Sequence, residues 1–296
     1  MTTSQTLVDC HFHVFDAGVA VASARYRPPY AAPLADWLAM AGALGDPAVD
    51  PVDAVDPYGV VVQTSFLGTD NSAMLAALGR MPGRLRGVAV VDPAVDDAEL
   101  ATLDAAGVRG IRLNLYGDAG WRRIDTAPWR TLFRRVAALG WHVDLHTNNG
   151  DGAMVLAALD AALGDTPSDT PGDTPDDTPT PIVLDHFGRP GPLGLDDPVF
   201  DAARAVAARR PLWVKISAPY RLASPDQWPT LAAHWAEVAG PDRLLWGSDW
   251  PWTNHEAPAR ADECRAVMAW LAQRPDLSEG LRWRNAAALY GFALAG

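Results

Sequence analysis

The chain of 296 residues has little of several things that would point to particular classes of protein. It contains only two cysteines, Cys10 and Cys264, which lie in apparent core segments and show no metal-binding spacing. Such scarcity is typical of a reduced, cytoplasmic protein. No stretch approaches the roughly 20 apolar residues that a membrane span requires, and no basic segment followed by an apolar run opens the sequence. We therefore expect neither a membrane span nor a targeting segment.

Positive charge is also scarce. The formal net charge is −12, and no cluster of lysine or arginine offsets it. A nucleic-acid-binding protein would need such a cluster, so the charge pattern argues against nucleic acid as a partner. Hydrophobic residues make up 49% of the sequence, which is enough to bury a sizeable core.

A glycine-rich phosphate turn is missing after the first predicted strand, which disfavours a doubly wound open sheet. Instead, eight strand-like segments alternate with helical ones, and this pattern predicts a single (β/α)8 TIM-type barrel over residues 1–296. The predicted strands are 6–16, 59–65, 87–93, 108–115, 141–147, 181–186, 212–217 and 244–251. The predicted helices are 34–43, 71–80, 97–106, 129–139, 153–163, 200–209, 227–238 and 257–272, with a short terminal helix at 281–290.

One segment breaks the alternation. Residues 165–180 are four tandem tetrapeptides, each beginning Asp-Thr-Pro. A proline at every fourth position excludes a regular helix or strand, and the aspartates favour contact with solvent. We interpret the segment as an insertion between a helix and the next strand, where a barrel places its loops away from the active site.

The first predicted strand carries the most unusual pattern. Its alternation predicts two different faces, namely Val8, Cys10 and Phe12 against Asp9, His11 and His13. Burying two imidazoles on one face is costly unless they have partners. The pair is therefore either a hydrogen-bonded strand end or part of a larger cluster.

The other predicted strands supply partners for a cluster. In a barrel, the carboxyl ends of all strands meet at one mouth. Seven strands end in polar residues that can face this mouth: Asp9, His11 and His13; Gln63; Arg112 and Asn114; Asp144 and His146; His186; Lys215 and Ser217; and Asp249. Together they predict one functional site.

The chemistry of this set allows two interpretations. Histidine and aspartate are the ligand types of zinc and other divalent ions, and His11, His13, His146 and Asp249 could hold one such ion. Without metal, the same groups suit acyl transfer, in which histidines polarise a carbonyl and a carboxylate takes a proton from water. A loop at residues 25–30, rich in arginine and tyrosine, suits an anionic ligand.

These residues and their neighbours resemble the amidohydrolase superfamily, and within it the 2-pyrone-4,6-dicarboxylate lactonase branch. The likeness rests on the His-x-His pair, His146, His186 and Asp249, and on four motifs: Arg-Gly-Ile-Arg-Leu-Asn at 109–114, Asp-His-Phe-Gly-Arg-Pro at 185–190, Lys-Ile-Ser-Ala-Pro-Tyr-Arg at 215–221 and Gly-Ser-Asp-Trp-Pro at 247–251. It covers nearly the whole chain except the repeat insertion.

The resemblance implies hydrolysis of a lactone ester. Asp249 would be the general base that activates water, and His11, His13 and His186 would polarise the carbonyl. The resemblance also implies that Arg112, Tyr220 and Arg221 hold substrate carboxylates, since guanidinium groups match carboxylates in shape. We count Gln63, Asn114, Ser217 and Tyr30 among the residues expected to bind substrate, the last through a lid contact.

The sequence departs from the family in two ways. Binuclear members carry a carboxylated lysine on the fourth strand, where this chain has Arg112, so a binuclear centre is not expected. The branch is similar to metal-independent catalysts whose fifth strand can end in tyrosine, whereas His146 stands here. The prediction is therefore an enzyme that does not strictly require a cofactor, with a single divalent ion such as zinc left open.

Three functions compete at this stage. The leading interpretation is a hydrolase that opens a small anionic lactone, such as a pyrone dicarboxylate or a sugar-acid lactone. The alternative is a zinc-dependent aromatic-acid decarboxylase of the same superfamily. A non-catalytic binding protein is the third, and it is disfavoured because no expected acid or base is missing. The sequence does not specify the lactone or the oligomeric state.

Overall fold

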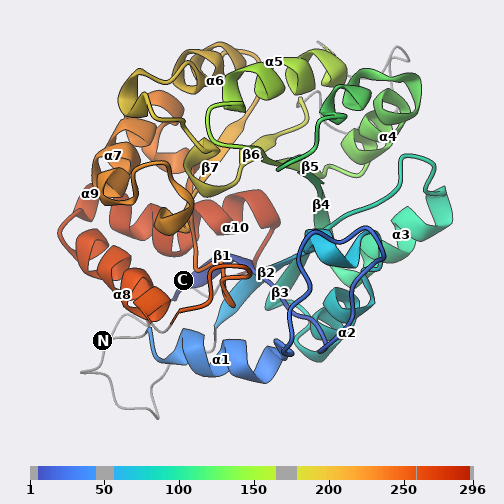
Figure 1. Ribbon diagram of the computed structural model, residues 1–296, viewed down its shortest axis with the longest axis horizontal. Coiled ribbons are helices and arrows are strands. Elements are labelled where there is room, and N and C mark those ends of the chain that lie inside the picture. Colours follow the sequence, from blue (N-terminus) through green and yellow to red (C-terminus); the bar gives the residue numbers. More distant parts are fainter. Residues whose placement is uncertain (1–5, 45–56, 165–178, 258, 294–296) are drawn as a thin grey trace.

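The computed structural model describes residues 6–44, 57–164, 179–257 and 259–293. Eight parallel strands follow one another around the sheet in chain order, and the helices form an outer ring (Figure 1). The strands are β1 Val8–Phe12, β2 Tyr58–Val62, β3 Leu85–Ala89, β4 Val108–Asn114, β5 His142–His146, β6 Ile182–Leu184, β7 Leu212–Ser217 and β8 Leu244–Gly247. The helices are α1 Leu34–Gly42, α2 Ser72–Arg80, α3 Asp97–Ala106, α4 Ala127–Ala138, α5 Gly152–Leu163, α6 Val199–Ala207, α7 Trp228–Ala239, α8 Ala259–Ala272, α9 Pro275–Glu279 and α10 Asn285–Tyr290.

The first and last strands meet and nearly close the sheet. The Asp249 N–H donates to the His11 carbonyl at 2.8 Å, and the His13 N–H donates to the Trp250 carbonyl at 2.8 Å. The structure therefore confirms the predicted barrel, and the open-sheet alternative is wrong. The sequence insertion at 165–180 lies almost wholly outside the described residues, which resume at residue 179.

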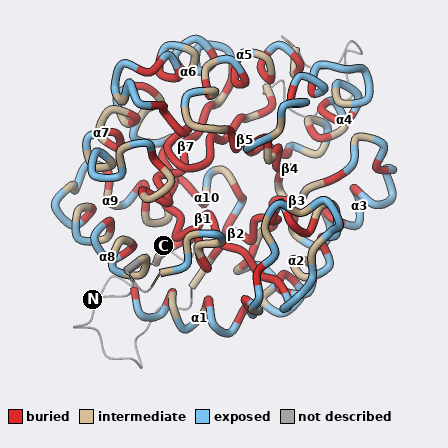
Figure 2. Tube along the Cα trace, in the orientation of Figure 1, coloured by how far each residue is buried: buried red, intermediate tan, exposed pale blue. Residues whose placement is uncertain are grey.

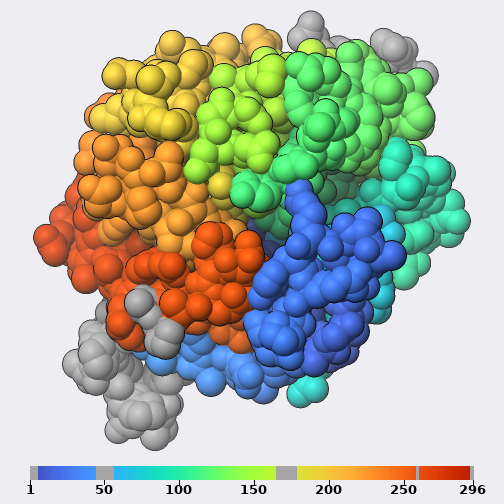
Figure 3. Space-filling view, in the orientation of Figure 1, coloured from blue at the N-terminus to red at the C-terminus, as the bar shows by residue number. Residues whose placement is uncertain are grey.

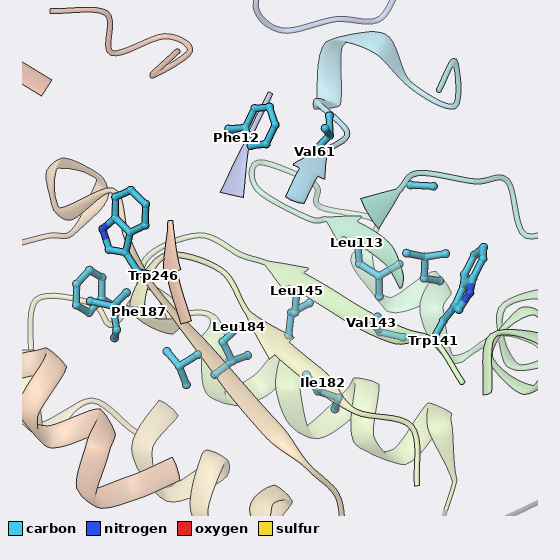
Figure 4. Packing of buried hydrophobic residues seen from close by; sticks show 14 of the residues in the cluster. Phe12, Val61, Leu113, Trp141, Val143, Leu145, Ile182, Leu184, Phe187 and Trp246 are labelled. Carbon is cyan, nitrogen blue, oxygen red and sulfur yellow. The ribbon is translucent and has the colours of Figure 1, made fainter. Parts of the chain in front are cut away.

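The layer between strands and helices holds most of the apolar core. Side chains on the outer faces of the strands pack against the helices, as Figure 4 shows for Phe12, Val61, Leu145 and Leu184. Phe12 stacks on Trp37 of α1 with ring centroids 3.9 Å apart. The helices themselves are buried on this inner side and exposed outward (Figure 2). Packing on this layer fixes the strand directions, and hence where their ends meet.

The interior of the barrel has its own, smaller core near the amino ends of the strands. It is formed by Val8, Cys10, Val60, Val62, Val88, Val183, Trp213 and Leu245, together with Tyr290 and Phe292. The segment around α10 closes this end, because Arg86 at the start of β3 donates to the carbonyls of Tyr290 and Gly291 at 3.1 and 2.9 Å. The predicted terminal helix is thus a cap on the end opposite the site.

Within β1 the simple alternation is wrong. The pairing of β1 with β2 shifts register between Asp9 and Phe12, so the strand carries an irregularity there. Val8 and Cys10 face the barrel interior, whereas Phe12 faces α1. Asp9 does not point to the mouth, because it accepts hydrogen bonds from Trp37 Nε1 at 2.9 Å and Ser248 Oγ at 2.6 Å. Such bulges commonly re-aim side chains beside active sites.

None of the helices in the described residues is both long and apolar enough to cross a membrane.

Candidate active site

Asp249 lies at the centre of the polar cluster in the mouth. It follows β8 with a backbone φ of 59°, a left-handed conformation that is uncommon for a non-glycine residue. Its Oδ2 atom accepts hydrogen bonds from Arg221 Nε at 2.6 Å and from the Tyr220 hydroxyl. Its Oδ1 atom is buried and finds no hydrogen-bond donor among the described residues. One carboxylate oxygen is thus fixed, and the other is available for chemistry.

Three histidines surround the available oxygen. The Nε2 atoms of His11, His13 and His186 lie 3.5, 3.4 and 3.8 Å from Asp249 Oδ1. His13 Nδ1 lies 2.7 Å from the Val62 carbonyl, which can only accept, so Nδ1 carries a proton, and in the neutral ring Nε2 then has a lone pair. His186 follows β6 with a φ of 50°, and its Nδ1 lies 2.8 Å from Ser217 Oγ. The three imidazoles and the carboxylate therefore converge on one small volume.

Burial and charge set the protonation of this cluster. Burial lowers the pKa of His11 to about 4 and holds the pKa of His186 well below its usual value. Burial alone would raise the pKa of Asp249, but Arg221 and the surrounding histidines hold it well below the usual range. At neutral pH the cluster therefore holds a carboxylate beside the neutral imidazoles of His11 and His186.

A second charged network lies beneath the histidines. Asp185 accepts from Arg112 Nε at 2.9 Å and lies 3.1 Å from Lys215 Nζ, which also donates to Asp144. Burial opposes ionisation of Asp185, yet Lys215, His11 and Arg112 hold its pKa well below the usual value. The charges in this network are paired, as buried charges must be.

Arg189 is different, because it forms no ion pair with a carboxylate in the described part of the chain. Its Nε donates to Asn149 Oδ1 at 2.7 Å, and its Nη1 lies 3.5 Å from His146 Nε2. Burial and the nearby Arg221 lower the pKa of Arg189 to about 10, so it remains charged at neutral pH. A buried cation without an anion is a ready site for an anionic ligand.

His146 contacts the ring of His186 edge to face, with centroids 5.1 Å apart, but it offers no ligand atom to the group around Asp249. Its two ring nitrogens face guanidinium groups, with Nδ1 3.2 Å from Arg112 Nη2 and Nε2 3.5 Å from Arg189 Nη1. The ring also stacks on Tyr116, with centroids 5.7 Å apart. This surrounding of positive charge suits an anion better than a metal ion.

The loop before α1 lies beside the segment after β8 (Figure 3). Tyr26 and Tyr30 both donate to Glu256, the latter at 2.6 Å. Arg25 donates to the Tyr116 carbonyl beyond β4. The lid contact predicted for Tyr30 is therefore made with the protein itself, and its contact with substrate stays a prediction.

Other predicted substrate residues also have partners. Gln63 donates to the Asp70 carbonyl, and Arg112 is held by Asp185, by the Gln63 carbonyl at 3.1 Å and by His146. Asn114, paired in register with His146, has a buried Oδ1 atom without a hydrogen bond from the described residues. Arg112, Tyr220 and Arg221 each contact an aspartate, and their predicted contacts with substrate carboxylates stay predictions.

Sequence reasoning assigned no role to four residues of the site, namely Asp185, Arg189, Asn149 and Tyr116. Asp185 and Arg189 could have been predicted from the sequence, because both belong to the motif at 185–190. Asn149 and Tyr116 lie in loops after β5 and β4, where no periodic pattern places a side chain. Their contacts depend on loop conformation, which local sequence patterns do not encode.

The donor set fits a single divalent ion by type and spacing. His11, His13 and Asp249 each offer one ligand atom within 4.8 Å of the others, and so do His11, Asp185 and His186. His11 Nε2 and Asp249 Oδ1 have no hydrogen-bond partner in the described structure. His146, the fourth predicted ligand, belongs to neither group.

The chain is similar to a protein family and to several known proteins. The family model described as Amidohydrolase matches residues 8–292. A 4-sulfomuconolactone hydrolase from Rhizobium radiobacter is 30% identical over 294 residues, which cover 96% of this chain and 89% of that protein. A 2-pyrone-4,6-dicarboxylate hydrolase from Comamonas testosteroni is 32% identical over 265 residues, which cover 83% of this chain and 77% of that protein.

A solved structure from Pseudomonas putida, described as a candidate 2-pyrone-4,6-dicarboxylic acid hydrolase, has the same fold. It is 37% identical, with a TM-score of 0.80, and the match covers 98% of this chain and 99% of that one.

Proposed function

Because the chain belongs to the amidohydrolase family, we propose that it hydrolyses a small anionic lactone, with Asp249 activating the attacking water. The observation that carries this proposal is the environment of Asp249. Arg221 and Tyr220 fix Oδ2, while the buried Oδ1 faces three histidine nitrogens and has no donor of its own in the described residues. A general base needs this combination of fixed position and a free lone pair.

The water would lie between two acceptors. Asp249 Oδ1 and His13 Nε2 are 3.4 Å apart, and His13 cannot donate through Nε2 because its proton is on Nδ1. A water molecule has two protons to donate, so it can satisfy both atoms and keep a lone pair for the lactone carbonyl. The carboxylate takes the proton as the water oxygen bonds to the carbonyl carbon.

His186 would polarise the carbonyl. When the Ser217 hydroxyl donates to His186 Nδ1, the neutral ring carries its proton on Nε2, toward the reacting atoms. That N–H can donate to the carbonyl oxygen and stabilise the negative charge that develops there. Collapse of the tetrahedral species breaks the ring C–O bond, and the proton held by Asp249 passes to the leaving oxygen.

Arg189 would hold an anionic group of the substrate. It is buried and charged, and it forms no ion pair with a carboxylate in the described structure. The names of two relatives specify a dicarboxylate and a sulfonated lactone, both anionic. Substrate contacts remain predictions for Arg112, Arg221, Asn114, Gln63 and Tyr30. Each of these residues would have to rearrange or make an additional contact when the substrate binds.

A divalent ion, when bound by His11, His13 and Asp249, would act as a Lewis acid on the carbonyl oxygen. The proposal assigns the proton transfer and the anion binding to the chain's own residues in either case.

The test is an assay of the purified protein with four kinds of substrate in parallel: 2-pyrone-4,6-dicarboxylate, 4-sulfomuconolactone, a neutral lactone and aromatic carboxylic acids. Acid release and carbon dioxide release are measured side by side, before and after treatment with a chelator. We expect acid release from at least one anionic lactone and little from the neutral one. Carbon dioxide release from aromatic acids without lactone hydrolysis would reject the hydrolase and favour the decarboxylase.

A further inference from the structure

Lys215 is the only lysine in a sequence that has 24 lysine and arginine residues. It lies on β7 with its side chain fully buried in the second charged network. Burial by itself would lower the pKa of Lys215, but Asp144 and Asp185 raise it above the usual value. The chain therefore uses arginine everywhere except at one point beneath the active site.

The shape of the site explains why an ammonium stands there. An ammonium is compact and has three donors, whereas a guanidinium is a wide, planar fork. Three acceptors surround Lys215 Nζ: a carboxylate oxygen of Asp144, Asp185 Oδ1 at 3.1 Å and His11 Nδ1 at 3.4 Å. Lys215 Nζ therefore has hydrogen-bonding geometry toward Asp144 and His11 and forms an ion pair with Asp185, and one of these partners is a histidine of the reaction site.

The contact with His11 has a chemical consequence. Asp185 Oδ1 lies 3.2 Å from the same ring nitrogen, but it makes no well-aligned hydrogen bond with any group in the described chain. Lys215 Nζ does have hydrogen-bonding geometry toward His11 Nδ1. An ammonium can only donate, so His11 Nδ1 must accept and the ring proton must be on Nε2.

We propose that Lys215 is a positioning residue that holds His11 in the Nε2–H form, so that His11 donates a hydrogen bond to the substrate carbonyl. His11 and His186 then form a pair of donors, with ring centroids 4.7 Å apart. His13 and Asp249 form the pair of acceptors for water. The role in turnover rests on the proposed hydrolysis, whereas the form of the ring does not.

The same arrangement bears on metal binding. A metal ion on His11 Nε2 needs a lone pair there, and the ring proton would then have to move to Nδ1. In that position it would face the Lys215 ammonium, and only Asp185 could accept it. Lys215 therefore favours the state without metal at His11.

The decisive measurement is nitrogen-15 NMR of the histidine rings in the full-length, chelator-treated protein. The spectrum of His11→Gln identifies the His11 signals by their loss. We expect His11 to show a protonated Nε2 and an unprotonated Nδ1. With lysine labelled as well, the single ammonium signal should show contacts to the His11 ring. A predominant Nδ1–H form of His11 would overturn the proposal, whether or not any lactone is a substrate.

A variant tests the cause. Lys215→Met removes the donor but keeps most of the side-chain volume, so His11 should change to the Nδ1–H form with Asp185 as acceptor. On a lactone that wild type hydrolyses, kcat should fall by about 10²-fold, the loss typical of one carbonyl donor, while KM changes by less than about threefold. Retention of the Nε2–H form together with wild-type kcat would contradict the proposal.

Two further variants separate the loss of the Lys215 donor from a general effect of removing a buried charge. Because Lys215→Met leaves two buried carboxylates with less positive charge, Lys215→Met/Asp144→Asn restores the balance and should show the same change in His11. Recovery of wild-type kcat in this double variant would show that Lys215 serves charge balance alone. Arg210→Met is the matched control, since Arg210 is a buried cation paired with Asp160 at 2.6 Å near the start of β7. It should leave the His11 signals and kcat unchanged.

Discussion

The same strands line two very different halves of the barrel interior. Along β7, the inward-facing residues run from Trp213 through Lys215 to Ser217, that is, from apolar through charged to polar. Along β1, Val8 and Cys10 belong to the apolar floor and His11 and His13 to the mouth. The position along the strand, rather than the strand itself, decides the chemistry of each inward-facing residue.

This difference shows how the two halves depend on each other. The apolar floor excludes water from one end, and a low local dielectric strengthens the ion pairs and hydrogen bonds above it. The charged half gains little stability from its own ion pairs, because desolvation offsets most of their attraction. We therefore expect changes in the floor to alter stability and changes in the mouth to alter turnover.

The largest expected effect is on turnover. Asp249→Asn keeps the size of the side chain but removes the proton acceptor, so kcat should fall by about 10²–10⁴-fold, the usual contribution of a general base. Steady-state kinetics on the lactone identified above would measure this. Asp160→Asn is the control, because Asp160 is also buried but lies away from the mouth, where it pairs with Arg210. An Asp249→Asn enzyme within tenfold of wild type would exclude Asp249 as the base.

The next effect is on stability. Tyr290→Ala removes a fully buried ring from the floor and should lower the free energy of unfolding by about 3–5 kcal/mol, the range for large aromatic truncations. At a temperature where the variant is folded, kcat should stay near the wild-type value. Tyr290→Phe is the matched control, since the hydroxyl has no hydrogen-bond partner in the described residues. Removal of this hydroxyl should hardly change the free energy of unfolding. Urea unfolding measures the free energy of unfolding of both variants. A large loss of kcat in either variant would contradict the expectation that changes in the floor alter stability and not turnover.

The mouth should also make stability depend on pH. Folding lowers the pKa of His11 to about 4 from a usual value of 6.5. Between these values the unfolded chain binds more protons, so the free energy of unfolding should fall as the pH decreases from 6.5 to 4. For His11 the loss approaches about 3 kcal/mol, and the lowered pKa of His186 and His146 adds to it in the same direction.

Urea midpoints measured across this pH range for wild type and His11→Gln test that expectation. The variant should show a smaller slope, because the glutamine does not titrate. Equal slopes would mean that His11 is not the neutral, buried imidazole that the structure shows.

The sequence predicted the fold well because barrels rely on local signals. Helix α3 has the predicted bounds, 97–106, since an aspartate cap at Asp96 and a left-handed Gly107 mark its ends. Strand β5 also follows the alternation, with Asp144 facing Lys215 and Leu145 facing the helices. In both elements, residues close together in the sequence determine the predicted feature, namely the ends of α3 and the alternation of β5.

The site was predictable only in part. His11, His13, His186 and Asp249 converge as expected, because strand ends in a barrel must meet. The predicted position of Asp9 at the mouth was wrong. A register shift arises from the pairing of two strands, so the residue pattern of one strand does not reveal it. The pairing of Arg112 with Asp185 joins residues 73 positions apart, and no spacing rule reports such a contact.

The smallest effect concerns the one cation in the mouth that lacks an anion in the described chain. If Arg189 binds an anionic group of the substrate, Arg189→Met should raise KM for an anionic lactone by about tenfold, or 1.4 kcal/mol, and hardly change KM for a neutral one. Arg189→Lys keeps the charge but loses the planar fork, so its KM should lie between the two. Arg204→Met is the control, because Arg204 lies on α6 and pairs with Asp201 at 2.9 Å, away from the mouth. Equal losses on charged and neutral lactones would mean that Arg189 supports the mouth through Asn149 rather than recognising charge, since only a direct contact with an anion discriminates by charge.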